Sequence, residues 1–253
     1  MIGYSLRCVD CAIVQAKYLS DQFAPYVPKS KIAVLYQAMD IVKFTDEHHT
    51  KVETGKILVM GHMTKAKGYT DILKIIPDIS ELYPHAKFYF AGNMRKGERG
   101  VFYNQYTGDK LHYEDPFEAE QKILNSEFKV NYINLGIISG DEKMSHLQTT
   151  DIFLTASYSE GFSRSLLEAM AMGKPAIYTK VGAHREVFKD RIHGNALVPG
   201  ELEQLKSALS QMLKDESNRR FIGRTNRQHV VSRFSIQTIA RDFENIISKT
   251  LAS

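Results

Sequence analysis

The fold is decided by residues 151–179, which read DIFLTASYSEGFSRSLLEAMAMGKPAIYT. The apolar run Asp151–Ala156 predicts a buried strand, and a turn around Gly161 follows it. Apolar residues from Leu166 to Met172 are then spaced as in a helix, and a second apolar run, Pro175–Thr179, predicts another strand. Strand, helix and strand in this order are typical of a crossover between two parallel strands.

The same alternation continues on both sides of this unit. Further strands are predicted at Lys56–Gly61, Lys87–Gly92, Val130–Gly136 and Ala196–Val198, with helical patterns at Ile72–Leu82, Met144–Leu147 and Ala183–Phe188. Strands that alternate with helices form a parallel sheet covered on both faces. We therefore expect an α/β fold with a doubly wound parallel (Rossmann-like) sheet. Two helical stripes, at 202–213 and 236–247, follow it, and Ser235 is placed to cap the second.

The composition is that of an ordinary globular chain. Of the 253 residues 43% are apolar, too many for a disordered chain, and no apolar stretch approaches the roughly 18 residues of a transmembrane helix. Met1 does not begin a secretory signal pattern, so a cytoplasmic setting is expected. Cys8 and Cys11 lack a second pair of metal ligands, so neither a zinc site nor a redox role is predicted.

Positive charge is concentrated in one segment. The net charge of +4 is too small to indicate a nucleic-acid partner. Residues 214–233 contain six positive and two negative side chains, an excess that equals that of the whole chain. Two interpretations stay open: a solvated helix face, or a patch that rests on an acidic partner or on anionic lipids at the inner membrane face.

Residues that could bind a ligand or take part in a reaction lie just after the predicted strand Asp151–Ala156. Ligands of doubly wound sheets bind beyond the carboxyl ends of the strands, and the next helix begins near Ser163. Its first N–H groups can hold a phosphate, with Arg164 and Ser165 as further donors. Glu160 precedes the helix, and Glu168 lies on its second turn, within reach of a ribose diol. The alternative is an ordinary Glu–Gly turn followed by an exposed helix glutamate.

The string Glu160-Gly-Phe, followed by Glu168-Ala-Met-Ala-Met-Gly-Lys-Pro, is similar to the E-x7-E signature of retaining glycosyltransferases with the GT-B fold, especially family 4. Other segments resemble further motifs of that family, so that the match covers nearly the whole chain. They are Gly61 with Lys67-Gly68, Phe90–Gly92, Leu135-Gly136, Val181–Glu186, His193–Asn195 and Ile32–Asp40.

The resemblance implies a role for each matching residue. Glu160 would contact the donor sugar and Lys67 the leaving diphosphate, which makes them the candidate catalytic residues. The other candidate donor-binding residues are Gly61, His62 and Lys65 at the diphosphate, Gly136 and Ile137 at the base, Gly161 and Phe162 beside the sugar, Ser163, Arg164, Ser165 and Leu166 at the phosphates, and Glu168 at the ribose. The donor would be a nucleotide-sugar and the acceptor a glycan or lipid-linked glycan. Neither a cofactor nor a metal is implied, because the helix dipole and basic side chains supply positive charge.

The chain departs from the family in two ways. His62 stands where the family has a phosphate-binding arginine, and Lys65 is expected to compensate. The N-terminal, acceptor-side domain is largely missing: residues 1–55 are interpreted as its remnant plus a linker, 56–233 as the donor domain and 234–253 as the C-terminal crossover helix. Exposed apolar surface is therefore expected around Ile236–Ile247 and in the region from Cys8 to Tyr36.

Several functions follow from this interpretation. The first is a glycosyltransferase that transfers sugar to an acceptor hydroxyl with retention, this chain being mainly the donor-binding half. The alternative is a non-catalytic nucleotide-sugar-binding subunit, or a truncated copy, that needs a separate N-terminal domain chain. A sugar-nucleotide epimerase or a phosphorylase is a weaker third possibility. The Tyr-rich excursion at 93–121 is either a surface insertion or a polar wall of the binding site.

Overall fold

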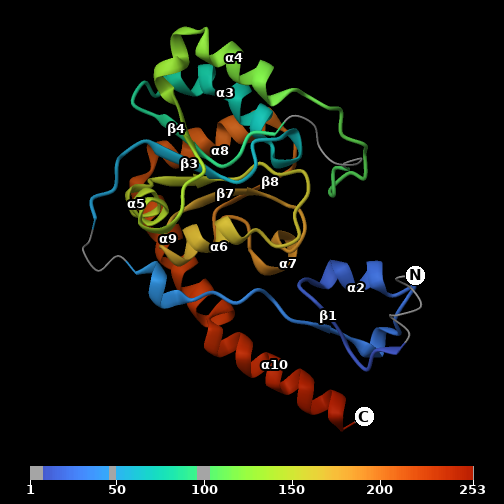
Figure 1. Ribbon diagram of the computed structural model, residues 1–253. Coiled ribbons are helices and arrows are strands. Elements are labelled where there is room, and N and C mark those ends of the chain that lie inside the picture. Colours follow the sequence, from blue (N-terminus) through green and yellow to red (C-terminus); the bar gives the residue numbers. More distant parts are fainter. Residues whose placement is uncertain (1–7, 46–49, 96–102, 253) are drawn as a thin grey trace.

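The computed structural model of the chain describes residues 8–45, 50–95 and 103–252 (Figure 1). Its centre is a parallel sheet of six strands in the order β5-β4-β3-β6-β7-β8. The strands are β3 (Lys56–Met60), β4 (Lys87–Ala91), β5 (Tyr132–Gly136), β6 (Ile152–Leu154), β7 (Ala176–Thr179) and β8 (Asn195–Leu197). The predicted Rossmann-like sheet is confirmed, and the strand order reverses between β3 and β6, which is where such sheets bind ligands.

Helices cover both faces of the sheet (Figure 1). One face packs against α3 (Tyr69–Leu82), α4 (Pro116–Leu124) and α8 (Leu202–Lys214), and the other against α5 (Gly140–Thr149), α6 (Arg164–Ala171), α7 (His184–Val187) and the end of α9 (Glu216–Phe234). Neighbouring residues of a strand point to opposite faces. Ile57 accordingly belongs to the first core and Leu58 to the second, and this explains why the strands read as continuous apolar runs.

A glycine on α9 fixes the position of α6, the helix at the deciding motif. A Cβ placed on Gly223 would lie 2.1 Å from the carbonyl oxygen of Gly173, so any side chain there would push α9 away from the end of α6. At its other end, α6 begins at Ser163, whose hydroxyl accepts a hydrogen bond from the N–H of Leu166 at 3.4 Å. The start of α6 therefore lies at the sheet edge formed by the carboxyl ends of the strands.

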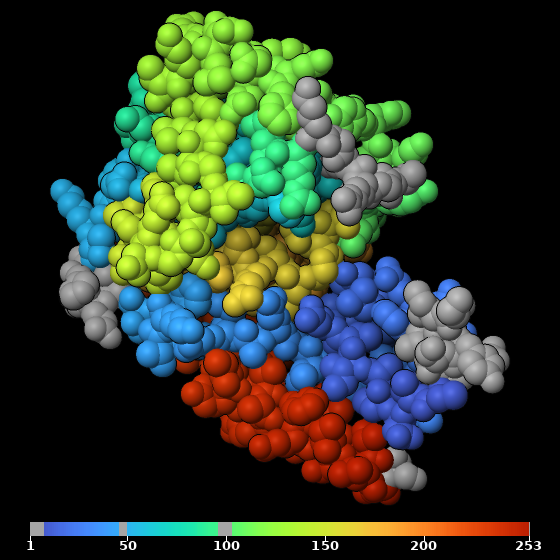
Figure 2. Space-filling view, in the orientation of Figure 1, coloured from blue at the N-terminus to red at the C-terminus, as the bar shows by residue number. Residues whose placement is uncertain are grey.

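The N-terminal residues form a small unit outside the main sheet. β1 (Ala12–Val14) and β2 (Ile32–Val34) pair in parallel, with α2 (Lys17–Phe23) between them. The last helix, α10 (Ile236–Leu251), projects from the sheet domain on the same side, and the two together make the lower part of the molecule in Figure 2. The predicted domain boundaries at 55 and 233 remain predictions.

The expected apolar surface is present on both segments. Ile236, Phe243 and Ile247 of α10 are 42–48% exposed, and Ile239 is the helix's one buried residue within the described part of the chain. In the N-terminal unit, Ile13 is 43% exposed. This prediction is therefore confirmed.

Two expectations about the elements were inaccurate. The strand predicted from Val130 begins at Tyr132, because residues Glu127–Asn131 form a short 3-10 helix that leaves Val130 exposed. The excursion at 93–121 includes the start of α4, which Asp115 caps by accepting a hydrogen bond from the N–H of Phe117. Residues 96–102 of the excursion lie outside the described part.

Among the described residues, no helix has both the length and the apolar character that crossing a bilayer requires.

Candidate functional site

A cavity of about 440 Å³ opens at the carboxyl ends of β3, β4 and β6, beside the switch point of the sheet. It is lined by many of the predicted site residues: Gly61, His62, Lys67, Ile137, Glu160, Phe162, Ser163, Arg164 and Ser165. Gly136, Gly161 and Leu166 adjoin these residues in the chain without lining the cavity themselves. Segments far apart in the sequence thus converge at one place.

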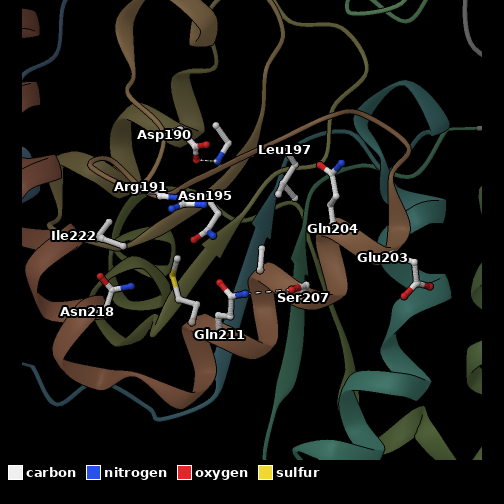
Figure 3. Close-up of a pocket in the computed structure, with 13 residues that line it drawn as sticks. Asp190, Arg191, Asn195, Leu197, Glu203, Gln204, Ser207, Gln211, Asn218 and Ile222 are labelled. Carbon is white, nitrogen blue, oxygen red and sulfur yellow. Dashed lines mark hydrogen bonds between the residues drawn. The ribbon is translucent and has the colours of Figure 1, made fainter.

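A larger hollow, of about 730 Å³, lies between β8, α8 and α9 (Figure 3). β8 is an edge strand, and side chains around this hollow accept hydrogen bonds from an N–H group of β8 and from the N–H group of the residue directly after it. Asp190 accepts from the N–H of Ala196 at 2.9 Å and Gln204 from that of Val198 at 3.3 Å. These groups protect the sheet edge against pairing with another strand, and the hollow lies beside β8 at this edge, not at the switch point between β3 and β6. We therefore take the smaller cavity as the candidate site.

The two candidate catalytic residues form an ion pair inside the cavity. The Nζ of Lys67 lies 2.8 Å from Oε1 of Glu160, which also accepts a hydrogen bond from the hydroxyl of Ser157 at 2.8 Å. The turn after Lys67 reaches the end of β6 because residue 68 is glycine. It has a φ of +71°, and a Cβ there would lie 2.2 Å from the carbonyl oxygen of Ala156.

The backbone of Glu160 is held from two sides. Its N–H donates to Oε1 of Gln105 at 3.0 Å, and its carbonyl oxygen accepts from the hydroxyl of Tyr18 at 3.0 Å. Gln105 belongs to the excursion, whose tyrosines Tyr103, Tyr106 and Tyr113 are exposed and do not line the cavity. A glutamine of the excursion thus supports the site. Of the two interpretations of the excursion, the polar wall built from its tyrosines is not supported, because none of the tyrosines that the structure describes there lines the cavity.

The start of α6 faces the cavity with polar groups. Arg164 and Ser165 occupy its first turn, where backbone N–H groups have no acceptor within a helix. The hydroxyl of Ser165 donates to the carbonyl oxygen of Met60 at 3.1 Å, which holds the end of β3 against this turn. Free N–H groups and the positive end of the helix dipole favour an anion at this position.

Glu168 is buried, so the alternative of an exposed helix residue is wrong. Its Oε1 lies 3.0 Å from the Nζ of Lys143 and 3.5 Å from the Nε of Arg164. The carboxylate therefore pairs with a cation of α5 and a cation of α6. Glu168 does not line the cavity itself, and its contact with a ribose remains a prediction.

Lys65 does not reach the cavity. Its ammonium group is buried, 2.6 Å from Oδ1 of Asp71 and 3.2 Å from Oε1 of Glu114, and the hydroxyl of Tyr158 donates to the other oxygen of Asp71. A buried lysine that pairs with the buried carboxylate of Asp71 and the partly exposed carboxylate of Glu114 has its charge balanced by the protein itself. The structure thus gives no support to the expectation that Lys65 compensates for His62.

His62 lines the cavity as a neutral side chain near pH 7. Burial lowers the pKa of its imidazole, and the positive charges of Arg95 and Lys67 lower it further. The lining residues that were missed from the sequence include four polar ones: Asn93 and Arg95 after β4, and Thr155 and Ser157 after β6. Their positions at or just beyond the ends of predicted strands were the available signal. For Asn93 and Arg95 this signal was missed, because residues 93–121 were interpreted as an excursion.

Two other motifs have structural contacts. Glu186, in the segment resembling a family turn, accepts hydrogen bonds from the N–H of Lys17 at 2.8 Å and from the hydroxyl of Tyr36 at 3.3 Å, and so ties the N-terminal unit to α7. In the basic segment, Arg219 is buried against Asp151 at 2.7 Å, and Arg227 donates to the carbonyl oxygens of Phe44 and Ala171. Two of its six positive charges thus stabilise the fold, and a membrane contact remains a prediction.

A parallel sheet with a polar cavity at its switch point defines a Rossmann-like α/β domain built to bind a ligand beyond its strands. The model of the family described as glycosyl transferases group 1 matches residues 41–229, and the chain belongs to this family. The fold is that of a GT-B glycosyltransferase, as the sequence motifs predicted.

The chain is similar to several characterised and uncharacterised proteins. It is 24% identical to an uncharacterized glycosyltransferase of Methanocaldococcus jannaschii over 231 residues, which cover 87% of this chain and 54% of that protein. It is 35% identical to N-acetyl-alpha-D-glucosaminyl L-malate synthase of Bacillus anthracis over 126 residues, which cover 50% of this chain and 32% of that enzyme. The chain thus spans about half the length, or less, of these relatives.

Solved structures share the fold. The crystal structure of Anabaena HepE in complex with UDP superposes with a TM-score of 0.81 at 18% identity, over 97% of this chain and 65% of that one. The C-terminal domain of a group 1 glycosyl transferase from Francisella tularensis superposes with a TM-score of 0.65 at 23% identity, over 79% of this chain and 100% of that domain.

Proposed function

We propose that the protein transfers a sugar from a nucleotide-sugar to an acceptor hydroxyl, with retention at the anomeric carbon, and that the 440 Å³ cavity binds the donor. The observation that carries this proposal is the Lys67–Glu160 ion pair next to the start of α6. A partly exposed cation, a carboxylate and the first backbone N–H groups of a helix thus surround one space. These groups are complementary to a diphosphate joined to a polyhydroxylated ring.

Each part of the cavity then has a task. The N–H groups of Arg164 and Ser165 bind the phosphate next to the sugar, and the ammonium of Lys67 balances the charge that develops on the leaving diphosphate as the glycosidic bond breaks. Glu160 accepts hydrogen bonds from sugar hydroxyls, with its backbone held by Gln105 and Tyr18. A relative of the same fold has been crystallised with UDP and glucose, which supports a donor of this class.

The base and the acceptor occupy the outer parts of the site. Ile137, whose side chain is largely exposed, lines the cavity after β5 and offers an apolar surface to the base. We infer that the described residues supply the donor side, and that an acceptor glycan or lipid-linked glycan approaches over Glu160, bound by a separate N-terminal domain. Binding of the donor without turnover would favour the alternative, a nucleotide-sugar-binding subunit.

Calorimetry with UDP-, GDP- and ADP-sugars tests this proposal. We expect one donor class to bind the wild-type chain, and Lys67→Ala and Glu168→Ala to weaken its binding about tenfold or more, since each removes a charged hydrogen-bonding group. Lys87→Ala is the matched control, because Lys87 is exposed at the amino end of β4, the opposite end of the sheet. Unchanged affinity in both site variants, or loss in the control, would count against this cavity as the donor site.

A further inference from the structure

The basic side chains that line the cavity differ in whether a carboxylate of the protein already pairs with them. Four of its lining side chains can be basic: His62, Lys67, Arg95 and Arg164. Lys67 is paired with Glu160 at 2.8 Å, and the Nε of Arg164 lies 3.5 Å from Glu168. His62 is neutral near pH 7, because burial and adjacent positive charge lower the pKa of its imidazole.

Arg95 differs from the other three. No carboxylate of residues 8–45, 50–95 or 103–252 lies within ion-pair distance of its guanidinium, although that group is near enough to His62 to affect its titration. A pyrophosphate that enters this cavity carries a negative charge on each phosphate. Within the described part of the chain, Arg95 is thus the lining cation that has no carboxylate within ion-pair distance, whereas Arg164 shares the carboxylate of Glu168 with Lys143.

The backbone explains why Arg95 lies at this place. The turns after β3 and β4 touch each other: the N–H of Met63 donates to the carbonyl oxygen of Asn93 at 3.1 Å, and Met63 and Met94 form a parallel bridge. This approach requires glycine at position 92, where a Cβ would lie 1.8 Å from the carbonyl oxygen of Gly61. Met94 packs against the core, and this anchors the residue that precedes Arg95.

We propose that Arg95 binds the pyrophosphate of the donor and supplies, from the turn after β4, the positive charge that His62 does not provide on the turn after β3. Arg95 thereby selects nucleoside diphosphates over monophosphates. A guanidinium suits this task, because it can donate two parallel hydrogen bonds to phosphate oxygens. The inference rests on the proposed function, since it assigns a residue of the same donor site.

The test compares a nucleoside diphosphate with the monophosphate of the same base by calorimetry. For Arg95→Ala we expect the affinity for the diphosphate to fall about 10- to 100-fold and the affinity for the monophosphate to change less than about threefold. Arg95→Lys should retain part of the affinity. The double variant His62→Arg/Arg95→Ala should recover most of it, because the charge returns on the neighbouring turn. Arg224→Ala, at an exposed position on α9, is the matched control and should bind both as the wild type does.

The outcomes separate this inference from the proposal on which it rests. Wild-type affinity for the diphosphate in Arg95→Ala, or an equal loss for diphosphate and monophosphate, would overturn the role of Arg95 while leaving the donor site in place. A wild-type chain that binds none of the UDP, GDP or ADP series would overturn the proposed function and this inference together. Thermal unfolding of each variant checks that the fold is kept, which we expect because Arg95 is exposed.

Discussion

Two lysines of one short turn, Lys65 and Lys67, lie in opposite environments, one buried in the protein and the other in the cavity. Lys65 and Lys67 both belong to η4 (Lys65–Lys67), a single 3-10 turn after β3. Lys65 enters a buried network with Asp71 and Glu114, and its ammonium also lies 5.0 Å from the centre of the Tyr158 ring. Lys67 enters the cavity, where it meets only the carboxylate of Glu160 among the described ion pairs.

The difference teaches how a structural cation is told from a ligand-binding one. Side chains at positions i and i+2 of a helical turn do not face each other, so one of the two lysines points inward when the other points to the cavity. The inward lysine gathers enough oxygen partners to offset its desolvation and has little capacity for a ligand. The cavity lysine keeps part of its surface in water and can exchange one anion for another.

Replacing the glycine that holds this turn should have the largest effect. Gly68→Ala places a Cβ 2.2 Å from the carbonyl oxygen of Ala156, at a φ of +71° that side chains rarely adopt. We expect the chain to misfold or to lose most of its stability. The contacts of both Lys65 and Lys67 should be disrupted as well. Gly108→Ala is the matched control, because its φ is +83° but no atom lies within 4 Å of the added Cβ. It should cost only about 1–2 kcal/mol, as chemical denaturation can show; equal losses in the two variants would contradict the close approach.

Exchanging each lysine for methionine tests the comparison directly. Lys65→Met leaves the carboxylate of Asp71 buried without its cation, so we expect a loss of about 3–5 kcal/mol and a fall in Tm of roughly 10 °C, with donor affinity kept at temperatures where the variant is folded. Lys67→Met should cost about 1 kcal/mol or less, because its pair is partly exposed, and should weaken donor binding. Thermal unfolding and calorimetry on both variants measure the two effects. A loss of donor binding in folded Lys65→Met, or a loss of stability in Lys67→Met as large as that of Lys65→Met, would contradict the roles of the two lysines.

The fold was largely predictable from the sequence, and the strand 56–61 shows why. A buried parallel strand contributes residues to two cores, as Ile57 and Leu58 do, and so leaves a continuous apolar run between polar turns. The 3-10 segment before β5 was not predictable, because Val130 is apolar and extends the strand pattern even though its side chain is exposed. Hydrophobicity alone does not reveal the backbone turn that points it outward.

The candidate site was predictable only where residues lie next to a recognisable turn. Glu160 and Lys67 follow strands, and each lies next to a glycine of a recognisable turn, of which Gly68 closely approaches the end of β6. The roles of Lys65 and Arg95 depend on partners distant in the sequence: Glu114 is 49 residues from Lys65, and the turn before Arg95 reaches the cavity by pairing with the turn after β3. Spacing along the chain carries no information about such pairs.

The smallest expected effect is a pH dependence on the Lys65 side of the turn. Burial alone would raise the pKa of Glu114, but the hydrogen bonds from Lys74 and the charges of Lys65 and Lys74 lower it to about 2, from 4.5 for a free glutamate. A lowered pKa means that the unfolded chain binds this proton more tightly than the folded one. The stabilisation by Glu114 is therefore complete above pH 4.5 and is lost as the pH falls from 4.5 toward 2. Because Glu114 is about one-third exposed, the loss is smaller than that of Lys65→Met.

Urea unfolding at pH 6 and at pH 3 should show a larger decrease in the free energy of unfolding for the wild type than for Glu114→Gln, which has no such proton to bind. Equal decreases would mean that the charge of Glu114 is not held by Lys65 and Lys74, and the contrast between the two lysines would then rest on Asp71 alone.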